Sequence, residues 1–180
     1  MSRYLGDIRQ NGFVVRDIQA AMEHWTEDLG VGPFLNREET SFADFHYRGS
    51  PSKARARMAF AHAGPLQIEL IQPIDDEPSM YRDFLAGGRE GLQHLGYLVD
   101  DYEAEVAGCV ERGWVVGQSG SIDGVRFSYF ETAGSSEGQC GAHPGTVVEV
   151  IEGTELARQF YAMLEARCRS WDGRDPIRRS

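Results

Sequence analysis

The chain has 180 residues, a hydrophobic fraction of 41% and a formal net charge of −10. This length predicts one compact domain, or two small modules that share a core. The negative charge argues against binding to nucleic acid or to an anionic membrane, because both need clustered Lys and Arg. No apolar run approaches the roughly 18 residues that span a membrane, and the segment "MSRYLGDIRQ" lacks the apolar core of a signal peptide.

The chain has three cysteines, Cys109, Cys140 and Cys168, and no CxxC spacing. A sparse and odd set of cysteines is typical of reduced thiols rather than of a disulfide framework. We therefore expect a cytoplasmic protein. Cys109 falls on a predicted helix and is expected to be a small core residue.

The first half of the chain begins with a strand pattern at residues 8–15, "IRQNGFVV". Asp17 is the expected N-cap of the helix that follows, "IQAAMEHWTEDL", and Gly30 ends that helix. A short connecting helix is expected at 79–88. Shorter extended segments lie between the two helices, at 32–38, 44–49, 56–64 and 66–73.

The second half of the chain follows the same order. "LQHLGYLVDD" predicts a strand at 92–101, and Asp101 is the expected cap of the next helix, "YEAEVAGCVERG". Extended segments follow at 114–119, 125–132 and 146–152. A helix at about 153–169 has an apolar side formed by Leu156, Phe160, Met163 and Leu164. Residues 171–180 are polar and predict a flexible tail.

The chain therefore looks internally duplicated. If residue 10 is laid on residue 94, the following residues match: Gly12 with Gly96, Phe13 with Tyr97, Val15 with Val99, and Asp17 with Asp101. If 66–72 is laid on 146–152, Glu69 matches Glu149. Four polar residues thus form two equivalent pairs, Gln10 with His94 and Glu69 with Glu149.

Strand alternation puts these four residues on one face of the sheet, because neighbouring side chains of a strand point to opposite sides. In "LQIELIQ" the apolar face is Leu66, Ile68 and Leu70, so Gln67 and Glu69 point away from the helix. The same parity turns Gln10, His94 and Glu149 away from their helices. If the sheet is curved, this face lines a cleft.

One imidazole and two carboxylates are good ligands for Zn²⁺, Ni²⁺, Co²⁺, Mn²⁺ or Fe²⁺, and the amide oxygen of Gln10 completes the set. A divalent ion also neutralises two carboxylates that would otherwise repel each other. The alternative is that each residue is ordinary surface or core. His24, His46, His62 and His143 have no counterpart in the other half and are not expected ligands. Arg55 and Arg57 either grip a substrate carboxylate or face solvent.

Four segments carry a resemblance to a known family: "GFVVRDIQAAMEHWTEDLGVGPF", "LQIELIQP", "GLQHLGYLVDD" and "GTVVEVIEG". They resemble the vicinal oxygen chelate superfamily, which includes glyoxalase I, methylmalonyl-CoA epimerase, extradiol dioxygenases and bleomycin-resistance proteins. The resemblance implies an α+β fold in which two βαβββ modules, about 8–75 and 91–152, form a curved mixed sheet around a metal-binding cleft. Together with the C-terminal helix they make a single domain at 1–170.

In this superfamily one ligand lies at the start of each module and one on its last strand, which places the metal on Gln10, Glu69, His94 and Glu149. Epimerase-like members usually carry His at the first of these places and Gln at the second. The set found here resembles that of some glyoxalase I enzymes instead. With His94 as the sole histidine of the set, two-histidine dioxygenase chemistry is disfavoured, and no glutathione site or basic grip for CoA is visible.

The resemblance and the two glutamates together suggest proton-transfer chemistry. We expect isomerisation, epimerisation or a lyase step on a small α-oxygenated carbonyl compound, through a metal-stabilised enolate. Glu149 is the first candidate for the base and Glu69 the second.

Two other functions stay open at this point. One is a non-catalytic binding protein of the bleomycin-resistance type, in which Tyr129 or Phe130 would contact a drug or metabolite. The other is an isomerase without a metal, which would need carboxylates of raised pKa.

The segment 132–145 is either a lid or an ordinary connection. From the resemblance we expect a homodimer.

Overall fold

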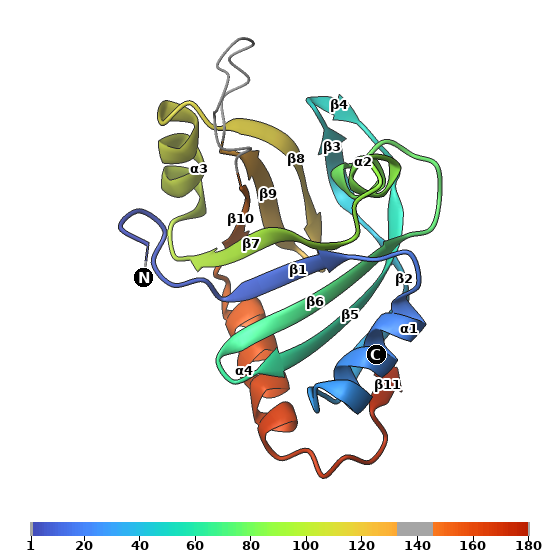
Figure 1. Cartoon of the computed structure of the whole chain (residues 1–180). Helices are drawn as coiled ribbons and strands as arrows, with labels where there is room; N and C mark the ends of the chain where they lie inside the picture. The colour runs from blue at the N-terminus through green and yellow to red at the C-terminus, as the bar shows by residue number, and fades with distance from the viewer. Residues whose placement is uncertain (1, 133–145, 180) are drawn as a thin grey trace, which may run out of the picture.

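The computed structural model describes residues 2–132 and 146–179 (Figure 1). In this part of the chain, one mixed sheet contains eleven strands in the order β11-β2-β5-β6-β1-β7-β10-β9-β8-β3-β4. The strands of the first half are β1 (Gln10–Val14), β2 (Phe34–Ser41), β3 (Ala43–Tyr47), β4 (Ser50–Pro51), β5 (Arg55–Ala63) and β6 (Leu66–Pro73). The others are β7 (Gly91–Val99), β8 (Val115–Ile122), β9 (Val125–Glu131), β10 (Val147–Glu152) and β11 (Ile177–Arg179).

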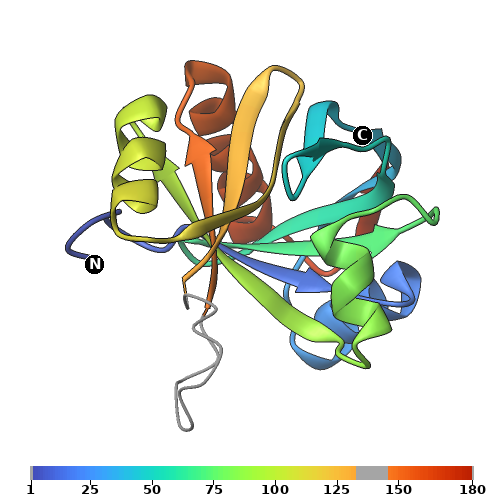
Figure 2. The same cartoon turned by 90° about the horizontal axis from the view of Figure 1, so that it is seen from above.

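The helices are α1 (Ile18–Glu23), continued by the π-helical turn η1 (His24–Asp28), then α2 (Met80–Ala86), α3 (Tyr102–Glu111) and α4 (Glu155–Arg169). None of the helices in the described ranges is both long and apolar enough to cross a membrane. The large curved mixed sheet with its C-terminal helix confirms the predicted α+β fold class (Figures 1 and 2).

The repeat seen in the sequence is visible in the strand pairing. β1 and β7 lie antiparallel at the centre of the sheet, and each has a parallel neighbour on its other side, β6 beside β1 and β10 beside β7. The two halves are therefore related by an approximate two-fold axis between β1 and β7. This axis brings equivalent residues of the two halves close together.

The helices α1 and α3 cover the same face of the two half-sheets, as the alternation predicts. The side chain of Asp17 accepts hydrogen bonds from the N–H groups of Gln19 and Ala20, and Asp101 caps α3 in the same way. Ile68 and Leu70 pack in the core with α1, while Tyr97 and Val99 pack with the fully buried Cys109 of α3. The opposite face is left for polar groups.

Two segments extend the sheet in a way that the sequence pattern does not predict, although an extended segment at 44–49 was expected. The β3–β4 hairpin belongs to the first half of the chain but pairs with β8 of the second half, so it extends the other half-sheet. The C-terminal tail corrects a prediction. We predicted that residues 171–180 are flexible, but β11 pairs in parallel with β2, from Ile177 to Arg179. An edge strand with unpaired backbone groups explains this pairing, because β2 offers hydrogen bonds that a polar tail can take.

The C-terminal helix α4 lies on the face of the sheet opposite α1. Its Phe160 ring meets Phe60 of β5 edge-on, and Tyr161 meets His62 in the same manner. Its buried stripe is Ala157, Tyr161 and Leu164, so the predicted apolar side is confirmed at Leu164 but is wrong at Leu156, which is 55% exposed. Figure 1 shows α4 close to β10 and β5, beneath the centre of the sheet.

Candidate metal centre

The four polar residues of the repeat lie on adjacent central strands. Gln10 on β1 is paired with Gly96 on β7, and Glu149 on β10 is paired with the same glycine. By the two-fold relation, His94 on β7 and Glu69 on β6 both pair with Gly12 of β1. Each glycine is therefore flanked by two of the four polar residues, all of them on the face away from α1 and α3.

The two glycines provide the space for these side chains. A Cβ atom on Gly12 would overlap the imidazole ring of His94, and a Cβ atom on Gly96 would lie 2.6 Å from Gln10 Oε1. The distance from the Gly12 Cβ atom to the His94 ring would be 1.7 Å, and real Cβ atoms essentially never lie within 3.0 Å of such a neighbour. Glycine is thus required at both positions by the side chain that crosses over it from the neighbouring strand.

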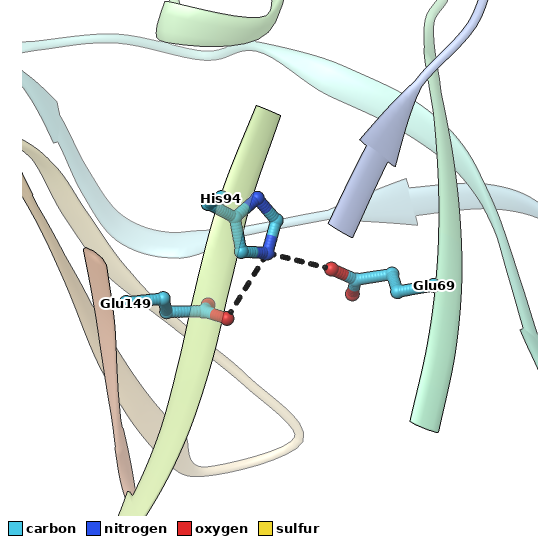
Figure 3. A group of neighbouring side chains, drawn as sticks. All are labelled: Glu69, His94 and Glu149. Carbon is cyan, nitrogen blue, oxygen red and sulfur yellow. Dashed lines mark ion pairs between the residues drawn. The ribbon is translucent and has the colours of Figure 1, made fainter. Parts of the chain in front are cut away.

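Three of the four side chains meet at their tips (Figure 3). His94 Nε2 lies 3.2 Å from Glu69 Oε2 and 3.4 Å from Glu149 Oε2. Ligand atoms bound to one ion at about 2.1 Å are separated by about 3.0 Å in an octahedron and by about 3.4 Å in a tetrahedron. The two measured distances match neighbouring positions around one cation.

The site is buried, with Gln10, Glu69, His94 and Glu149 each between 1% and 5% exposed. Within the described residues, four of its atoms have no hydrogen-bond partner: Gln10 Oε1, Glu69 Oε2, His94 Nε2 and Glu149 Oε2. The His94–carboxylate distances allow ion pairing, but neither pair has hydrogen-bond geometry. One orphaned lone-pair atom from each of four residues is the donor set that a divalent cation needs, since unpaired buried polar atoms are otherwise costly.

A neighbouring glutamine fixes the orientation of His94. His94 Nδ1 lies 2.7 Å from Gln93 Oε1. An amide oxygen can only accept, so Nδ1 carries a proton and Nε2 is the nitrogen that faces the two carboxylates. A register shift makes this contact possible: Gly12 pairs with His94 and Phe13 pairs with Leu92, which leaves Gln93 as an extra residue in β7.

A second glutamine fixes Gln10. Gln10 Nε2 donates to Gln67 Oε1 at 2.8 Å, so Gln10 Oε1 is the atom left facing the site. Gln67 lies on β6, two residues before Glu69, and is paired with Gln10 across the parallel ladder. This hydrogen bond holds Gln10 in the orientation that a metal ligand requires.

The electrostatics of the metal-free cluster follow from burial and from the two carboxylates. Burial acts to lower the pKa of His94, but the adjacent carboxylates of Glu149 and Glu69 outweigh it and raise that pKa to about 9. Burial raises the pKa of Glu69, against the lowering effect of His94. In the metal-free protein a proton on His94 thus balances part of the negative charge.

Aromatic rings close one side of the cluster. The ring of Tyr129 lies edge-on to His94, with centroids 4.7 Å apart, and the hydroxyl of Tyr81 on α2 donates to the hydroxyl of Tyr129. Phe130 points to the opposite face and packs near α3. Of the two aromatic residues expected near the cleft, the structure puts Tyr129 behind the site and Phe130 in the core.

On the other side of the cluster lies a cavity of 170 Å³. It reaches Gln10, Glu69 and Glu149 at its polar end, and α4 forms one of its walls. The rest of its lining is mainly apolar, with Phe60, Phe127, Phe160 and Ile151 among the residues that form it. A small molecule in this cavity would lie beside Gln10, Glu69 and Glu149, three of the four residues that carry the orphaned atoms.

The remaining histidines lie apart from this cluster where the structure describes them. His24 is exposed and pairs with Asp28, and His46 is half-buried on β3. His62 is buried beneath α4, where burial lowers its pKa. His143, Cys140 and most of the segment 132–145, for which we left a lid or an ordinary connection open, lie outside the described residues.

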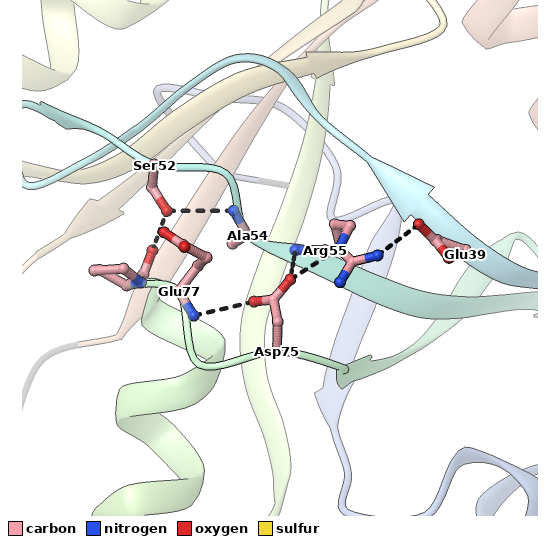
Figure 4. A network of polar contacts seen from close by, with 7 residues as sticks. Glu39, Ser52, Ala54, Arg55, Asp75 and Glu77 are labelled. Carbon is pink, nitrogen blue, oxygen red and sulfur yellow. Dashed lines mark hydrogen bonds and ion pairs between the residues drawn. The ribbon is translucent and has the colours of Figure 1, made fainter.

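The two strand arginines are engaged at the surface. Arg55 pairs with Glu39 and with Asp75, in a network that also holds Glu77 and Ser52 (Figure 4). Arg57 lies 3.7 Å from Glu38. These contacts favour the solvent-facing alternative for both arginines, because neither lines the cavity beside the cluster.

Sequence reasoning missed three residues of the site. Gln67 could have been found, since it shares the parity of Glu69. Strand alternation predicts that the side chain of Gln93 points away from His94. It reaches His94 because of the irregularity in β7. Tyr161 reaches the cavity from α4, and the docking position of a terminal helix is not encoded in strand alternation.

Comparison with known proteins agrees with this architecture. The family model of the glyoxalase/bleomycin resistance protein/dioxygenase superfamily matches residues 9–129. The chain belongs to this superfamily. A search among curated proteins gives no match.

Solved structures share the fold at low sequence identity. Methylmalonyl-CoA epimerase from Mycobacterium tuberculosis is 18% identical with a TM-score of 0.54, over 88% of this chain and 95% of that one. A hypothetical protein from Bacillus halodurans C-125 is 19% identical with a TM-score of 0.54, over 83% and 95%. A Streptomyces coelicolor methylmalonyl-CoA epimerase variant, in complex with 2-nitronate-propionyl-CoA, is 18% identical with a TM-score of 0.52, over 84% and 96%.

Proposed function

We propose that this chain is a divalent-metal-dependent enzyme of the glyoxalase/epimerase type. It would catalyse proton-transfer isomerisation, epimerisation or lyase chemistry on a small α-oxygenated carbonyl compound. The observation that carries the proposal is the set of four buried, unpartnered ligand atoms on Gln10, Glu69, His94 and Glu149. The superfamily match and the fold shared with methylmalonyl-CoA epimerases support it.

The donor set fits a divalent ion in charge as well as in distance. Two carboxylates and one M²⁺ sum to zero formal charge, which lowers the cost of burying the glutamates. Four oxygen or nitrogen donors without thiolate suit Zn²⁺, Ni²⁺, Co²⁺, Mn²⁺ or Fe²⁺. A cation bound here supplies Lewis-acid polarisation of a substrate carbonyl.

The protein's own residues would then move the proton. Glu149 and Glu69 both line the cavity, so either carboxylate can reach a carbon atom held there. Glu149 is the first candidate for the base and Glu69 the second.

Proton exchange tests the chemistry without knowledge of the natural substrate. In D₂O, the metal-loaded protein should catalyse exchange of the α-protons of 2-hydroxyacetophenone, followed by NMR. Glu149→Gln should lower the exchange rate by about 10²-fold or more, because general-base catalysis contributes 10²–10⁴-fold. Unchanged exchange in Glu149→Gln would assign the base to Glu69, and Glu69→Gln is then the decisive variant.

The binding-protein alternative has support from the aromatic residues of the cavity, Phe60, Phe127 and Phe160. A sequestering protein would bind the same compounds and show no exchange with any metal. An isomerase without a metal would keep its exchange activity after treatment with EDTA.

A homodimer is our proposal for the assembly, and the mass of the full-length protein in solution tests it.

A further inference from the structure

We infer that Tyr161 and Gln67 form an oxygen-binding clamp beside the metal centre, in a pocket for small uncharged compounds with one aromatic or branched apolar group. This inference rests on the proposed function, since it names the substrate class of the same site. It assigns a substrate-binding role to the C-terminal helix, which neither the repeat nor the ligand set involves.

Tyr161 supplies the first donor. It lies on α4 and lines the same cavity as Glu69 and Glu149. The residue is 6% exposed, and its hydroxyl has no hydrogen-bond partner within the described residues. Its ring is held edge-on by His62, with centroids 5.8 Å apart. A buried hydroxyl without a partner costs free energy unless a ligand pairs with it.

Gln67 supplies the second donor. It is 1% exposed, lines the cavity, and uses its Oε1 to accept from Gln10. Its Nε2 atom has no partner within the described residues. Because Oε1 is already occupied, the amide cannot turn around without breaking that bond. Gln67 therefore has an unpaired N–H donor of fixed identity on a residue that lines the cavity.

The two donors define the charge of the ligand. Both are neutral groups that donate to an oxygen, so a carbonyl or hydroxyl group satisfies them without burying a charge. Among the described residues that line the cavity, Arg37 is the sole cation, and it pairs with Asp123 at 2.7 Å. A substrate carboxylate would have to compete with Asp123 for this arginine.

Burial keeps the Tyr161 hydroxyl protonated. It raises the pKa of Tyr161 well above the ordinary value, and the negative charges of Glu149 and Glu69 act in the same direction. Tyr161 is therefore a hydrogen-bond donor throughout the physiological pH range.

The apolar walls of the cavity limit the size of the ligand's apolar group. Phe60, Phe127, Phe160 and Ile151 surround the space beyond the polar end. The cavity volume of 170 Å³ is below the 300–1,000 Å³ typical of pockets for drug-sized molecules. One ring or a short branched chain fills such a space.

Binding of three probes to the full chain, by calorimetry with saturating Zn²⁺ and again after EDTA treatment, tests the inference. The probes are 2-hydroxyacetophenone, hydroxyacetone, which lacks the ring, and mandelate, which carries a carboxylate. With Zn²⁺ present, 2-hydroxyacetophenone should bind at least about tenfold more tightly than hydroxyacetone, because its ring leaves water. It should also bind more tightly than mandelate.

Tyr161→Phe removes a single oxygen atom and keeps the packing of α4. It should weaken 2-hydroxyacetophenone binding by about three- to tenfold, the usual effect of one neutral hydrogen bond, while Zn²⁺ affinity stays unchanged. Tyr97→Phe is the matched control, because Tyr97 packs on the opposite face near α3 and its loss should change neither affinity. Gln67→Leu should weaken the same probe and, by releasing Gln10, also weaken Zn²⁺ binding.

The inference is overturned if wild-type protein does not bind 2-hydroxyacetophenone, if hydroxyacetone or mandelate binds as tightly, or if Tyr161→Phe binds the probe like wild type. These failures leave the proposed function standing if Zn²⁺ still binds. Conversely, a protein that binds no divalent metal but binds the probe in a Tyr161-dependent way keeps the clamp and loses the metal-dependent function.

Discussion

Gly12 and Gly96 show at the scale of single residues how a duplicated chain builds a polar centre. Each glycine lies opposite a long polar side chain of the other half, His94 over Gly12 and Gln10 over Gly96. The missing side chains create the space that His94 and Gln10, two of the four candidate ligands, occupy. The glycines therefore belong to the site as much as the residues that fill it.

Replacement of Gly12 by alanine tests this role. The added methyl group would overlap the His94 ring and force it aside, so Gly12→Ala should abolish metal binding and cost about 1–3 kcal/mol of unfolding free energy. Metal titration and chemical denaturation measure the two effects. Gly108→Ala on α3 is the control, because the nearest atoms there belong to the flexible end of Arg112, and it should be neutral or stabilising. Metal binding by Gly12→Ala at wild-type affinity would contradict the geometry.

Competition between metal and proton at His94 gives a pH dependence. The pKa of His94 in the metal-free protein is about 9, so below pH 9 a metal must displace one proton from Nε2. Affinity should therefore rise about tenfold per pH unit between pH 6 and 8 and level off above pH 9. Calorimetry in buffers of different ionisation enthalpy should show release of about one proton per metal bound. Affinity that does not change over this range would contradict the involvement of His94.

At the scale of elements, the irregularity in β7 connects strand geometry to the chemistry of the site. The extra residue Gln93 lets a side chain of unexpected parity reach His94 Nδ1. Such a second contact usually sets the orientation of a ligating histidine.

Gln93→Ala should therefore weaken metal binding by about 10- to 100-fold without loss of the fold. The change removes the acceptor that fixes the His94 ring but leaves all four candidate ligand residues unchanged. Gln19→Ala on the exposed side of α1 is a control for the loss of a surface glutamine and should have no effect. Equal metal affinity in Gln93→Ala and wild type would show that packing alone orients His94.

The helices and strands also show which parts of the fold and of the site can be predicted from the sequence. The period of two in strands and the repeat were enough to place Gln10, Glu69, His94 and Glu149 on one face, because parity follows from local geometry alone. The positions of α4, β11 and the β3–β4 hairpin depend on contacts between segments far apart in the chain. Tyr161 and the ordered tail were accordingly not predicted.

At the scale of the whole molecule, the proposed site lies where the two halves meet. Its ligands come from β6 and β1 of the first half and from β7 and β10 of the second. A cation bound there would connect both halves of the sheet and would stabilise the folded state over the unfolded one.

Thermal unfolding measures that stabilisation. At a metal concentration 100 times the dissociation constant, the gain is about 2.7 kcal/mol, which corresponds to a rise in Tm of about 5–10 °C for a chain of this size. EDTA should reverse the rise. The double variant Glu69→Gln and Glu149→Gln, which removes both negative charges, should show little of it. A Tm that metal raises equally in this variant would place binding elsewhere.

The most direct test of the account is the metal content of the full-length protein. Wild-type protein is incubated separately with Zn²⁺, Ni²⁺, Co²⁺, Mn²⁺ and Fe²⁺, dialysed, and analysed by elemental mass spectrometry beside His94→Ala. We predict one tightly held divalent ion per chain for at least one of these metals, and its loss in His94→Ala. Wild-type protein that retains none of the five ions, or His94→Ala protein that retains as much as wild type, would contradict the central claim.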